Sequence, residues 1–184
     1  MVKSIIFSAP SGSGKTTIVK HILKTFPQVK FSISATTRPI RPNEVDGKDY
    51  HFISTPWFKH MIDLGEFVEW QEVYKDMFYG TLKSEVKSIW DKGGIVVYDM
   101  DVEGGVNLKE QFGDESLSFF IKVPIEQLEQ RLIERQTESM DKIQMRVSKA
   151  KKEMEYESKF DKVIINDNLE EALRKVEEII KDIL

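Results

Sequence analysis

The sequence contains no cysteine, which excludes disulfide bonds, thiolate metal sites and cysteine nucleophiles. It has no apolar run approaching the roughly 18 residues that a membrane-spanning helix needs, and its formal net charge of −4 provides no general positive field. Neither a membrane nor a nucleic acid is therefore an expected partner. Residues 1–3 leave no room for a signal peptide before the first apolar segment, so we expect a cytoplasmic location.

The 184 residues suit one α/β domain with a small insertion, because 40% of them are hydrophobic and 32% are charged. Four apolar runs are separated by helical patterns, which predicts a parallel sheet flanked by helices. These runs are at 5–7, 95–98, 117–123 and 162–166. Residues 30–35 are predicted to form one strand, and residues 50–53 the second strand of a hairpin. Short strands and local turns across 32–82 indicate a small antiparallel lobe.

A phosphate-binding loop is indicated between the first apolar strand and the first helical pattern, in the stretch Ser8-Ala9-Pro10-Ser11-Gly12-Ser13-Gly14-Lys15-Thr16-Thr17. Gly12 and Gly14 allow the backbone to curl so that its N–H groups point at a phosphate, and the helix that follows adds the positive end of its dipole. Lys15 is expected to reach the outer phosphates, and the Thr16 hydroxyl to bind a magnesium ion. These features predict a nucleoside triphosphate site.

Ala9 departs from the usual pattern G-x-x-x-x-G-K-[ST], which has glycine at this position. Alanine tolerates most backbone conformations except a positive φ. A glycine-rich turn that merely connects a strand to a helix is the alternative interpretation. The joint occurrence of strand, loop and amphipathic helix favours phosphate binding.

A second anion-binding site is indicated by Arg38 and Arg41, which lie in a loop stiffened by Pro39 and Pro42. Two guanidinium groups held in this way can address one phosphate. Solvated surface charge is the alternative for two arginines in a loop. Any phosphate acceptor that is itself anionic needs such cations, because two negative groups must be brought together.

Four further side chains are candidates for either site. Tyr50 and Tyr79 can donate hydroxyl hydrogen bonds, or can simply pack. Glu69 lies in an apolar strand pattern, where a carboxylate needs a partner or a ligand unless it is on the solvent face. Asp99 ends an apolar strand, where it can organise magnesium-bound water, pair with Lys15 or cap a helix.

In combination, these segments resemble guanylate kinase over almost the whole chain and in the same order. The resemblance rests on 8–17, 32–42, 44–50, Glu69, 79–81 and 99–101. It implies a single domain, 1–184, with a P-loop kinase core and two attached parts. The core comprises about 1–31, 83–133 and 160–184, with a GMP-binding lobe at about 32–82 and a helical lid at about 134–159.

The resemblance also implies a role for individual residues. Those expected to bind GMP are Ser34, Arg38, Arg41, Tyr50 and Tyr79 around the phosphate, and Glu69, Thr81 and Asp101 around the guanine. Those expected to bind ATP are Ala9, Pro10, Ser11, Gly12, Ser13, Gly14, Lys15, Thr16, Thr17, Arg131, Arg135 and Asn166. The catalytic set is Lys15, Arg38, Arg135, Arg146 and Asp99, and Mg²⁺ is expected at Thr16 and Asp99, partly through water.

The lid departs from the family in one respect, because Glu134-Arg135-Gln136 stands where Gly-Arg-Gly is frequent. The arginines of the lid are matched by Arg131, Arg135 and Arg146, and less glycine implies a stiffer or more helical lid. Pairing along a solvated helix face is the alternative for these arginines. Asn166 and Asp167 resemble the adenine-side contact of the family, and a turn is their alternative.

The implied reaction is transfer of the γ-phosphate of ATP to GMP or dGMP, with closure of lobe and lid to exclude water. Guanine offers two adjacent donors that one carboxylate can accept, whereas adenine offers an acceptor that Glu69 would repel. A kinase of phosphorylated sugars would have no need of Glu69. A peptide-binding scaffold of the same fold would be expected to lack an intact phosphate loop, and here Lys15 and Thr16 are present. No obligate protein partner is predicted.

Overall fold

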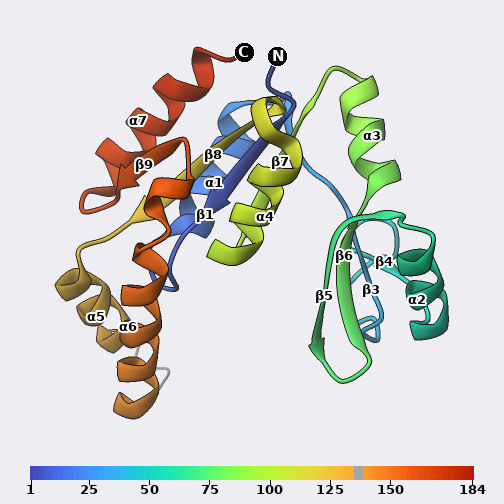
Figure 1. Cartoon of the computed structure of the whole chain (residues 1–184), viewed down its shortest axis with the longest axis horizontal. Coiled ribbons are helices and arrows are strands. Elements are labelled where there is room, and N and C mark those ends of the chain that lie inside the picture. The colour runs from blue at the N-terminus through green and yellow to red at the C-terminus, as the bar shows by residue number, and fades with distance from the viewer. Residues whose placement is uncertain (135–138) are drawn as a thin grey trace. The chain divides into compact units, whose positions relative to one another are not determined.

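The fold is organised around the strand β1 (Ser4–Ser8), whose five residues are all buried. In this computed structural model, which describes residues 1–134 and 139–184, β1 is the middle strand of a five-stranded sheet. The sheet has the order β2-β7-β1-β8-β9 and contains β2 (Val29–Phe31), β7 (Ile95–Met100), β8 (Ser116–Lys122) and β9 (Lys162–Ile165) (Figure 1). β8 pairs in parallel with both β1 and β9, as the alternation of strands and helices predicts.

Helices accompany this sheet, and each has a buried apolar stripe. They are α1 (Lys15–Thr25), α4 (Val102–Phe112), α5 (Ile125–Glu134), α6 (Met140–Met154) and α7 (Leu169–Lys181), with 3-10 turns η1 (Gly113–Glu115) and η2 (Glu157–Lys159). α1 ends just before Pro27, as expected for a residue that cannot continue a helix. Leu128 and Leu132 of α5 form one cluster with Ile143 and Val147 of α6. No helix in the described part of the chain is long and apolar enough to cross a membrane.

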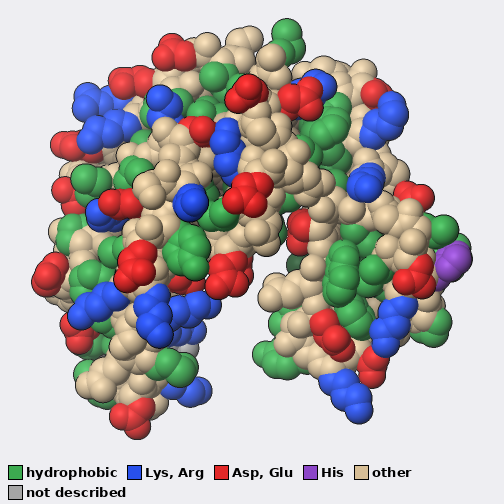
Figure 2. All heavy atoms as spheres, viewed as in Figure 1, with side chains coloured by type: hydrophobic (Ala, Val, Ile, Leu, Met, Phe, Trp, Pro, Cys, Tyr) green, Lys and Arg blue, Asp and Glu red, His purple; other side chains and the backbone are tan. Residues whose placement is uncertain are grey.

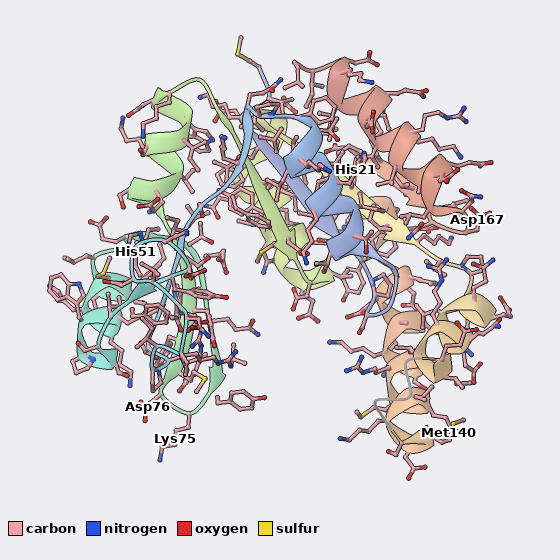
Figure 3. The ribbon with its side chains drawn as sticks, turned by 180° about the vertical axis from the view of Figure 1, so that it is seen from behind. His21, His51, Lys75, Asp76, Met140 and Asp167 are labelled. Atoms are coloured by element: carbon pink, nitrogen blue, oxygen red, sulfur yellow. The ribbon has the colours of Figure 1, made fainter. Side chains whose placement is uncertain are left out.

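A second sheet has the order β4-β3-β6-β5, formed by β3 (Ser34–Thr36), β4 (His51–Phe52), β5 (Phe67–Tyr74) and β6 (Met77–Leu82). β6 is antiparallel to both β3 and β5, and the β5–β6 hairpin turns at Lys75 and Asp76 (Figure 3). The helices α2 (Thr55–Asp63) and α3 (Lys83–Asp91) belong to the same part of the chain. Phe58 of α2 is fully buried against the sheet residues Phe67 and Phe78.

Two predictions about strand pairing are wrong. Residues 30–35 form two strands in different sheets, because β2 ends at Phe31 and β3 begins at Ser34. β4 is parallel to β3, with Ala35 opposite His51, and does not form a hairpin with it. An alternating pattern shows that residues are extended, but it does not identify their partner strand. The long connection 37–50 allows the parallel pairing that a tight turn at Gly47 would forbid.

The chain forms two compact units. Unit 1 comprises Met1–Val29 and Val97–Leu184, and unit 2 comprises Lys30–Val96. Unit 1 contains the phosphate loop, and unit 2 contains Arg38, Glu69 and the second sheet. Each unit therefore holds one set of candidate residues.

A polar network in unit 1 joins α4 to β8 and to the residue before β9. Asp161 accepts hydrogen bonds from the backbone N and the Oγ of Ser118, both at 2.8 Å, and pairs with Nζ of Lys109 at 2.9 Å. Burial opposes ionisation of Asp161, but the bonds from Lys109 and Ser118 outweigh it and hold the pKa of this carboxyl below its usual value. The ionised carboxylate is therefore the form that stabilises the folded chain.

Replacing this carboxylate in Asp161→Asn should lower the free energy of unfolding at pH 7 by about 1–3 kcal/mol, since three hydrogen bonds lose their charged acceptor. The pKa of Asp161 is lower in the folded chain than in the unfolded chain, where it is about 3.9. The stabilisation by Asp161 is therefore complete above this unfolded pKa, and it is lost as the pH falls through the pKa of Asp161 in the folded chain. Urea unfolding at pH 7, 5 and 2.5 measures the difference, which should shrink only at the lowest pH. Glu110→Gln, an exposed change on α4, is the control and should stay within about 0.5 kcal/mol. An equal loss for Asp161→Asn at all three pH values would contradict the assignment.

Candidate functional site

The phosphate loop has the backbone geometry that its glycines predict. Gly12 and Gly14 have φ values of 96° and 84°, a region that other residues rarely adopt. Gly14 is also the N-cap of α1, and no side chain caps the helix there. The N–H of Thr17 donates to the backbone O of Gly14 at 3.1 Å, so the N–H groups of Lys15 and Thr16 are the ones at this helix end that a ligand can use. Ala9 does not have a positive φ, which explains why alanine is tolerated at the first loop position.

A pocket of about 370 Å³ lies over this loop. It is lined by residues 9–17, Asp101, Lys149 and Glu153. Nζ of Lys15, one of these lining residues, is 2.6 Å from Oδ1 of Asp99 and donates to the backbone O of Met100. The predicted pairing of Lys15 with Asp99 is confirmed, and it holds the ammonium group at the carboxyl end of β7.

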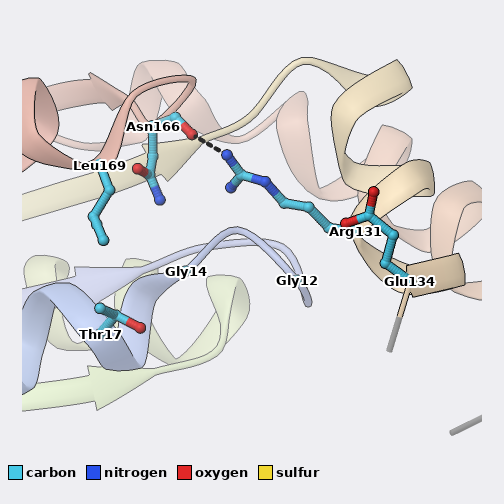
Figure 4. Close-up of a pocket in the computed structure, with 7 residues that line it drawn as sticks. All are labelled: Gly12, Gly14, Thr17, Arg131, Glu134, Asn166 and Leu169. Atoms are coloured by element: carbon cyan, nitrogen blue, oxygen red, sulfur yellow. Dashed lines mark hydrogen bonds between the residues drawn. The ribbon is translucent and has the colours of Figure 1, made fainter. Parts of the chain in front are cut away.

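A second pocket of about 430 Å³ lies beside the loop and is lined by Gly12, Gly14, Thr17, Arg131, Glu134, Asn166 and Leu169 (Figure 4). Nη2 of Arg131 donates to the backbone O of Asn166 at 2.9 Å. Leu169 supplies an exposed apolar side chain at the start of α7. An apolar surface with an arginine plane nearby suits an aromatic base. The structure therefore brings Arg131 and Asn166 together beside the loop, as expected for one nucleotide site.

The lid arginines are only partly described. Nη1 of Arg146 donates to Oγ of Ser11 at 3.3 Å, which connects α6 to the phosphate loop. Arg135 lies outside the described residues. Lysine and arginine side chains gather over α6 (Figure 2).

Two further residues of α6, Lys149 and Glu153, line the phosphate pocket, and the sequence interpretation missed them. Their charged groups are 3.4 Å apart, and the Glu153 side chain is only 15% exposed. They follow Arg146 by three and seven residues, so all three share one helix face. This spacing was the available signal, but the sequence did not show which face of α6 meets the loop.

In unit 2, three of the expected GMP-binding residues form a row across adjacent strands. Ser34 of β3 is opposite Thr81 of β6, which is opposite Glu69 of β5. Oγ1 of Thr81 donates to Oε1 of Glu69 at 2.6 Å. Residues opposite one another lie on the same face of a sheet. The row therefore presents two hydroxyl groups and one carboxylate side by side.

A β-bulge sets the orientation of Glu69. The register shifts between Phe67, which is opposite Leu82, and Glu69, which is opposite Thr81. Phe67 and Leu82 belong to the apolar cluster beneath α2. Residues two apart in a regular strand share a face, so the extra residue of the bulge turns Glu69 to the opposite face from Phe67. Glu69 is half-buried and accepts a hydrogen bond from Thr81, so it is not a simple solvent-facing carboxylate.

Gly80 permits the close approach of β5 and β6 at this point. A Cβ added to Gly80 would lie 2.8 Å from Cδ1 of Phe67 and 2.9 Å from the backbone O of Glu69. Because any side chain at Gly80 would displace the bulged segment, this glycine helps to fix the position of Glu69.

Arg38 is buried and is held by Glu44. Nη1 and Nη2 of Arg38 donate to the two carboxylate oxygens of Glu44, both at 2.8 Å, and the backbone N of Arg41 donates to Oε2 of Glu44 at 2.7 Å. The hydrogen bond from Arg38, followed by that from Arg41, lowers the pKa of Glu44 to about 2. The same pairing raises the pKa of Arg38. Glu44 thus connects both arginine positions of the loop.

Glu44 is the functional residue of unit 2 that the sequence interpretation missed. It lies three residues after Arg41, and Asn43 between them has a φ of 73°. This left-handed residue turns the chain so that Glu44 faces back to Arg38. An asparagine before an acidic residue is a weak turn signal, and it does not identify the arginine as partner.

The two expected tyrosines lie together with Arg38. The guanidinium carbon of Arg38 is 5.3 Å from the ring centre of Tyr50, and the rings of Tyr50 and Tyr79 are 6.0 Å apart. The hydroxyl of Tyr79 donates to Sδ of Met77 at 4.0 Å. Arg41 is exposed in the same loop. The structure therefore brings Arg38, Tyr50 and Tyr79 together. The tyrosine rings pack here, and their hydroxyl groups can also bind a ligand.

Asp101 is not in the unit that holds the other expected GMP-binding residues. It is the N-cap of α4 in unit 1, where its Oδ1 accepts a hydrogen bond from the backbone N of Gly104 at 2.7 Å. The helix-cap role considered for Asp99 thus belongs to Asp101. Its carboxylate also borders the phosphate pocket.

Comparison with known proteins gives a consistent result. The family model described as guanylate kinase matches residues 1–183. The guanylate kinase of Bacteroides fragilis is 49% identical over 183 residues, which is 99% of this chain and 90% of that protein. The guanylate kinase of Salinibacter ruber is 43% identical over 172 residues, which is 93% of this chain and 91% of that protein.

Solved structures agree. The crystal structure of guanylate kinase from Anaplasma phagocytophilum has a TM-score of 0.70 at 26% identity and covers 98% of this chain and 85% of that one. Shikimate kinase from Bacteroides thetaiotaomicron has a TM-score of 0.51 at 12% identity, over 97% of this chain and 98% of that one, which is a likeness of fold alone.

Replacing the arginine partner in Glu44→Gln should weaken GMP binding by roughly tenfold, because Arg38 loses the carboxylate that fixes its orientation. With a pKa of about 2, Glu44 is ionised at every pH from 5 to 8, so the ratio of variant to wild-type affinity should be constant over that range. Calorimetric titration with GMP measures it, with the exposed Asp63→Asn as control. Tighter GMP binding by Glu44→Gln would mean that Glu44 competes with the phosphate and does not position Arg38.

Proposed function

Because the chain belongs to the guanylate kinase family, we propose that it transfers the γ-phosphate of ATP to GMP, and to dGMP, giving ADP and GDP. The observation that carries the acceptor assignment is the row of Ser34, Thr81 and Glu69. A carboxylate can accept from both N1–H and the 2-amino group of guanine, and a fixed carboxylate opposes the N1 acceptor of adenine.

On the donor side, we assign ATP to the phosphate loop and to the pocket beside it. Residues 9–17 surround the phosphates, and N–H groups of the glycine-containing turn and the start of α1 donate to them, with Lys15 and Thr17 at the helix start. Arg131 and Asn166 lie on the adenine side, and Arg146 contacts the phosphates from α6. Arg135 is assigned to the same phosphates by family resemblance. The support comes from the glycine geometry at Gly12 and Gly14 and from the contact of Arg146 with Ser11.

On the acceptor side, we assign the GMP phosphate to Ser34, Arg38, Arg41, Tyr50 and Tyr79. Arg38 is already oriented by Glu44, so its remaining donors need little reorganisation to meet an anion. Asp101, which lies in unit 1, is assigned to the guanine by family resemblance. A phosphate near Arg38 would also gain the hydroxyl groups of the two tyrosines.

Mg²⁺ is proposed to accompany ATP. The exposed hydroxyl of Thr16 borders the phosphate pocket, and the Asp99 carboxylate lies next to Lys15. Such oxygen donors fit a magnesium ion that keeps several waters and phosphate oxygens, so Thr16 would hold it directly and Asp99 partly through water. When bound, the ion neutralises charge on the transferring phosphate.

No general base is required for this transfer. The acceptor phosphate has a second pKa of about 6 and is largely dianionic near pH 7, so its oxygen is already a nucleophile. The chain contributes alignment of the two nucleotides and neutralisation of the transferring group by Lys15, Arg38, Arg135 and Arg146. Measuring ADP release with GMP, dGMP, AMP, UMP and dTMP tests the proposal. A clear preference for any acceptor other than GMP or dGMP would overturn it.

The guanine assignment predicts that Glu69→Gln lowers kcat/KM for GMP by roughly 100-fold, about 2.7 kcal/mol. An amide offers one acceptor and one donor, so one guanine donor keeps its partner and the other faces a donor. Steady-state ADP release at varied GMP measures the change. Glu66→Gln, an exposed change directly before β5, should stay within about twofold. If Glu69→Gln retains wild-type selectivity for GMP over AMP, another residue reads the base.

The phosphate assignment predicts that Lys15→Met lowers kcat by roughly 100- to 1,000-fold, since the transferring phosphate loses its nearest fixed cation. Thermal unfolding with and without GMP establishes that the variant is folded and that its acceptor side is intact. Single-turnover transfer from ATP then isolates the chemical step. Unchanged turnover would contradict a catalytic role for the loop and favour a binding scaffold.

A further inference from the structure

Asn166 supports the phosphate loop from outside the phosphate pocket. It directly follows β9, and its backbone N donates to the O of Lys122 on β8 at 2.7 Å. Its side chain is buried, at 2% exposure, and points toward the loop near Gly14 (Figure 4). There Nδ2 of Asn166 donates to the backbone O of Ser13 at 2.7 Å.

This hydrogen bond determines the direction of a neighbouring amide. In a trans peptide the C=O and N–H groups point in opposite directions, so a Ser13 carbonyl fixed on Asn166 turns the N–H of Gly14 away from Asn166. Ser13 is itself buried, at 1% exposure, so its carbonyl needs a protein partner in place of water. Asn166 supplies that partner on the side of the loop that faces the second pocket.

The contact is close and leaves one group unpaired. A Cβ added to Gly14 would lie 2.5 Å from Nδ2 of Asn166, so this approach needs glycine for reasons of space as well as φ. Oδ1 of Asn166 is buried without a hydrogen-bond partner among the residues that the structure describes. The side chain is thus held by its donor bond, even though its acceptor goes unsatisfied.

Asn166 is also held from its other side. Arg131 donates to the backbone O of Asn166 at 2.9 Å, so a chain of hydrogen bonds runs from α5 through Asn166 to the phosphate loop. The charged groups around Asn166 in this pocket are Arg131 and Glu134.

We propose that Asn166 is a positioning residue that sets the Ser13–Gly14 peptide for phosphate binding, in addition to any contact with adenine. This inference rests on the proposed assignment of the loop to the phosphates of ATP. In this proposal the side-chain amide of Asn166 binds the carbonyl of Ser13, so it contributes to binding of the phosphates of the nucleotide.

A phosphate probe without a base separates this role from an adenine contact. Asn166→Ala should weaken binding of both MgADP and magnesium tripolyphosphate by roughly tenfold, because the Ser13 carbonyl loses its buried donor. If Asn166 contacts only adenine, tripolyphosphate binding will be unchanged, and the inference is overturned. Both affinities are measured by calorimetry and need no turnover, so a failure of GMP phosphorylation would leave this test intact.

Asn166→Asp provides a second, pH-dependent readout. The ionised carboxylate repels the Ser13 carbonyl, whereas the protonated acid can donate an O–H bond to it. Relative to wild type, tripolyphosphate binding by this variant should be weakest at pH 8 and should recover toward pH 5.5. Asn168→Asp adds the same charge two residues away, at the N-cap of α7, and should show no such recovery. Parallel profiles for the two aspartate variants would mean that added charge alone explains the effect, and would overturn the inference.

Discussion

The phosphate loop is held in shape by polar contacts between its residues and partners elsewhere in the chain. These partners come from distant parts of the chain. Asn166 follows β9 and binds the carbonyl of Ser13, while Ser8 at the end of β1 donates from Oγ to the O of Asp101 at 3.0 Å. Lys15 binds the end of β7. The parallel sheet places the carboxyl ends of these strands at one edge, and this arrangement gives the loop its shape.

A cation in each unit is likewise held in position by a partner within the chain. Lys15 is paired with Asp99, and Arg38 with Glu44, so each positive group has a fixed position without a nucleotide. Charges that are already oriented stabilise a transferring phosphate with little reorganisation. The carboxylates lower the net positive charge of each site, but they keep the ammonium and guanidinium groups from collapsing onto other partners. Each unit thus orients its own cation, Lys15 in unit 1 and Arg38 in unit 2.

Local chemistry made much of this predictable. The glycines of the phosphate loop require left-handed backbone, Pro27 ends α1, and Ser54 caps α2 by accepting from the N of Trp57. Each of these depends on a few neighbouring residues. The partner strand of a segment does not, which is why the alternating pattern at 30–35 predicts one strand where the structure has two. The bulge before Glu69 was also invisible, because its signal is a register shift against β6.

The sequence by itself determined the phosphate loop, the alternation of strands and helices, and the residue types of an arginine-rich acceptor loop. These follow from backbone preferences and from side-chain chemistry over short spans. Only the tertiary structure decided that Glu44 holds Arg38, that Thr81 holds Glu69, and that Asn166 faces the loop carbonyl of Ser13. Such pairings join residues up to 153 positions apart. They depend on how the strands are ordered and aligned, which local preferences do not specify.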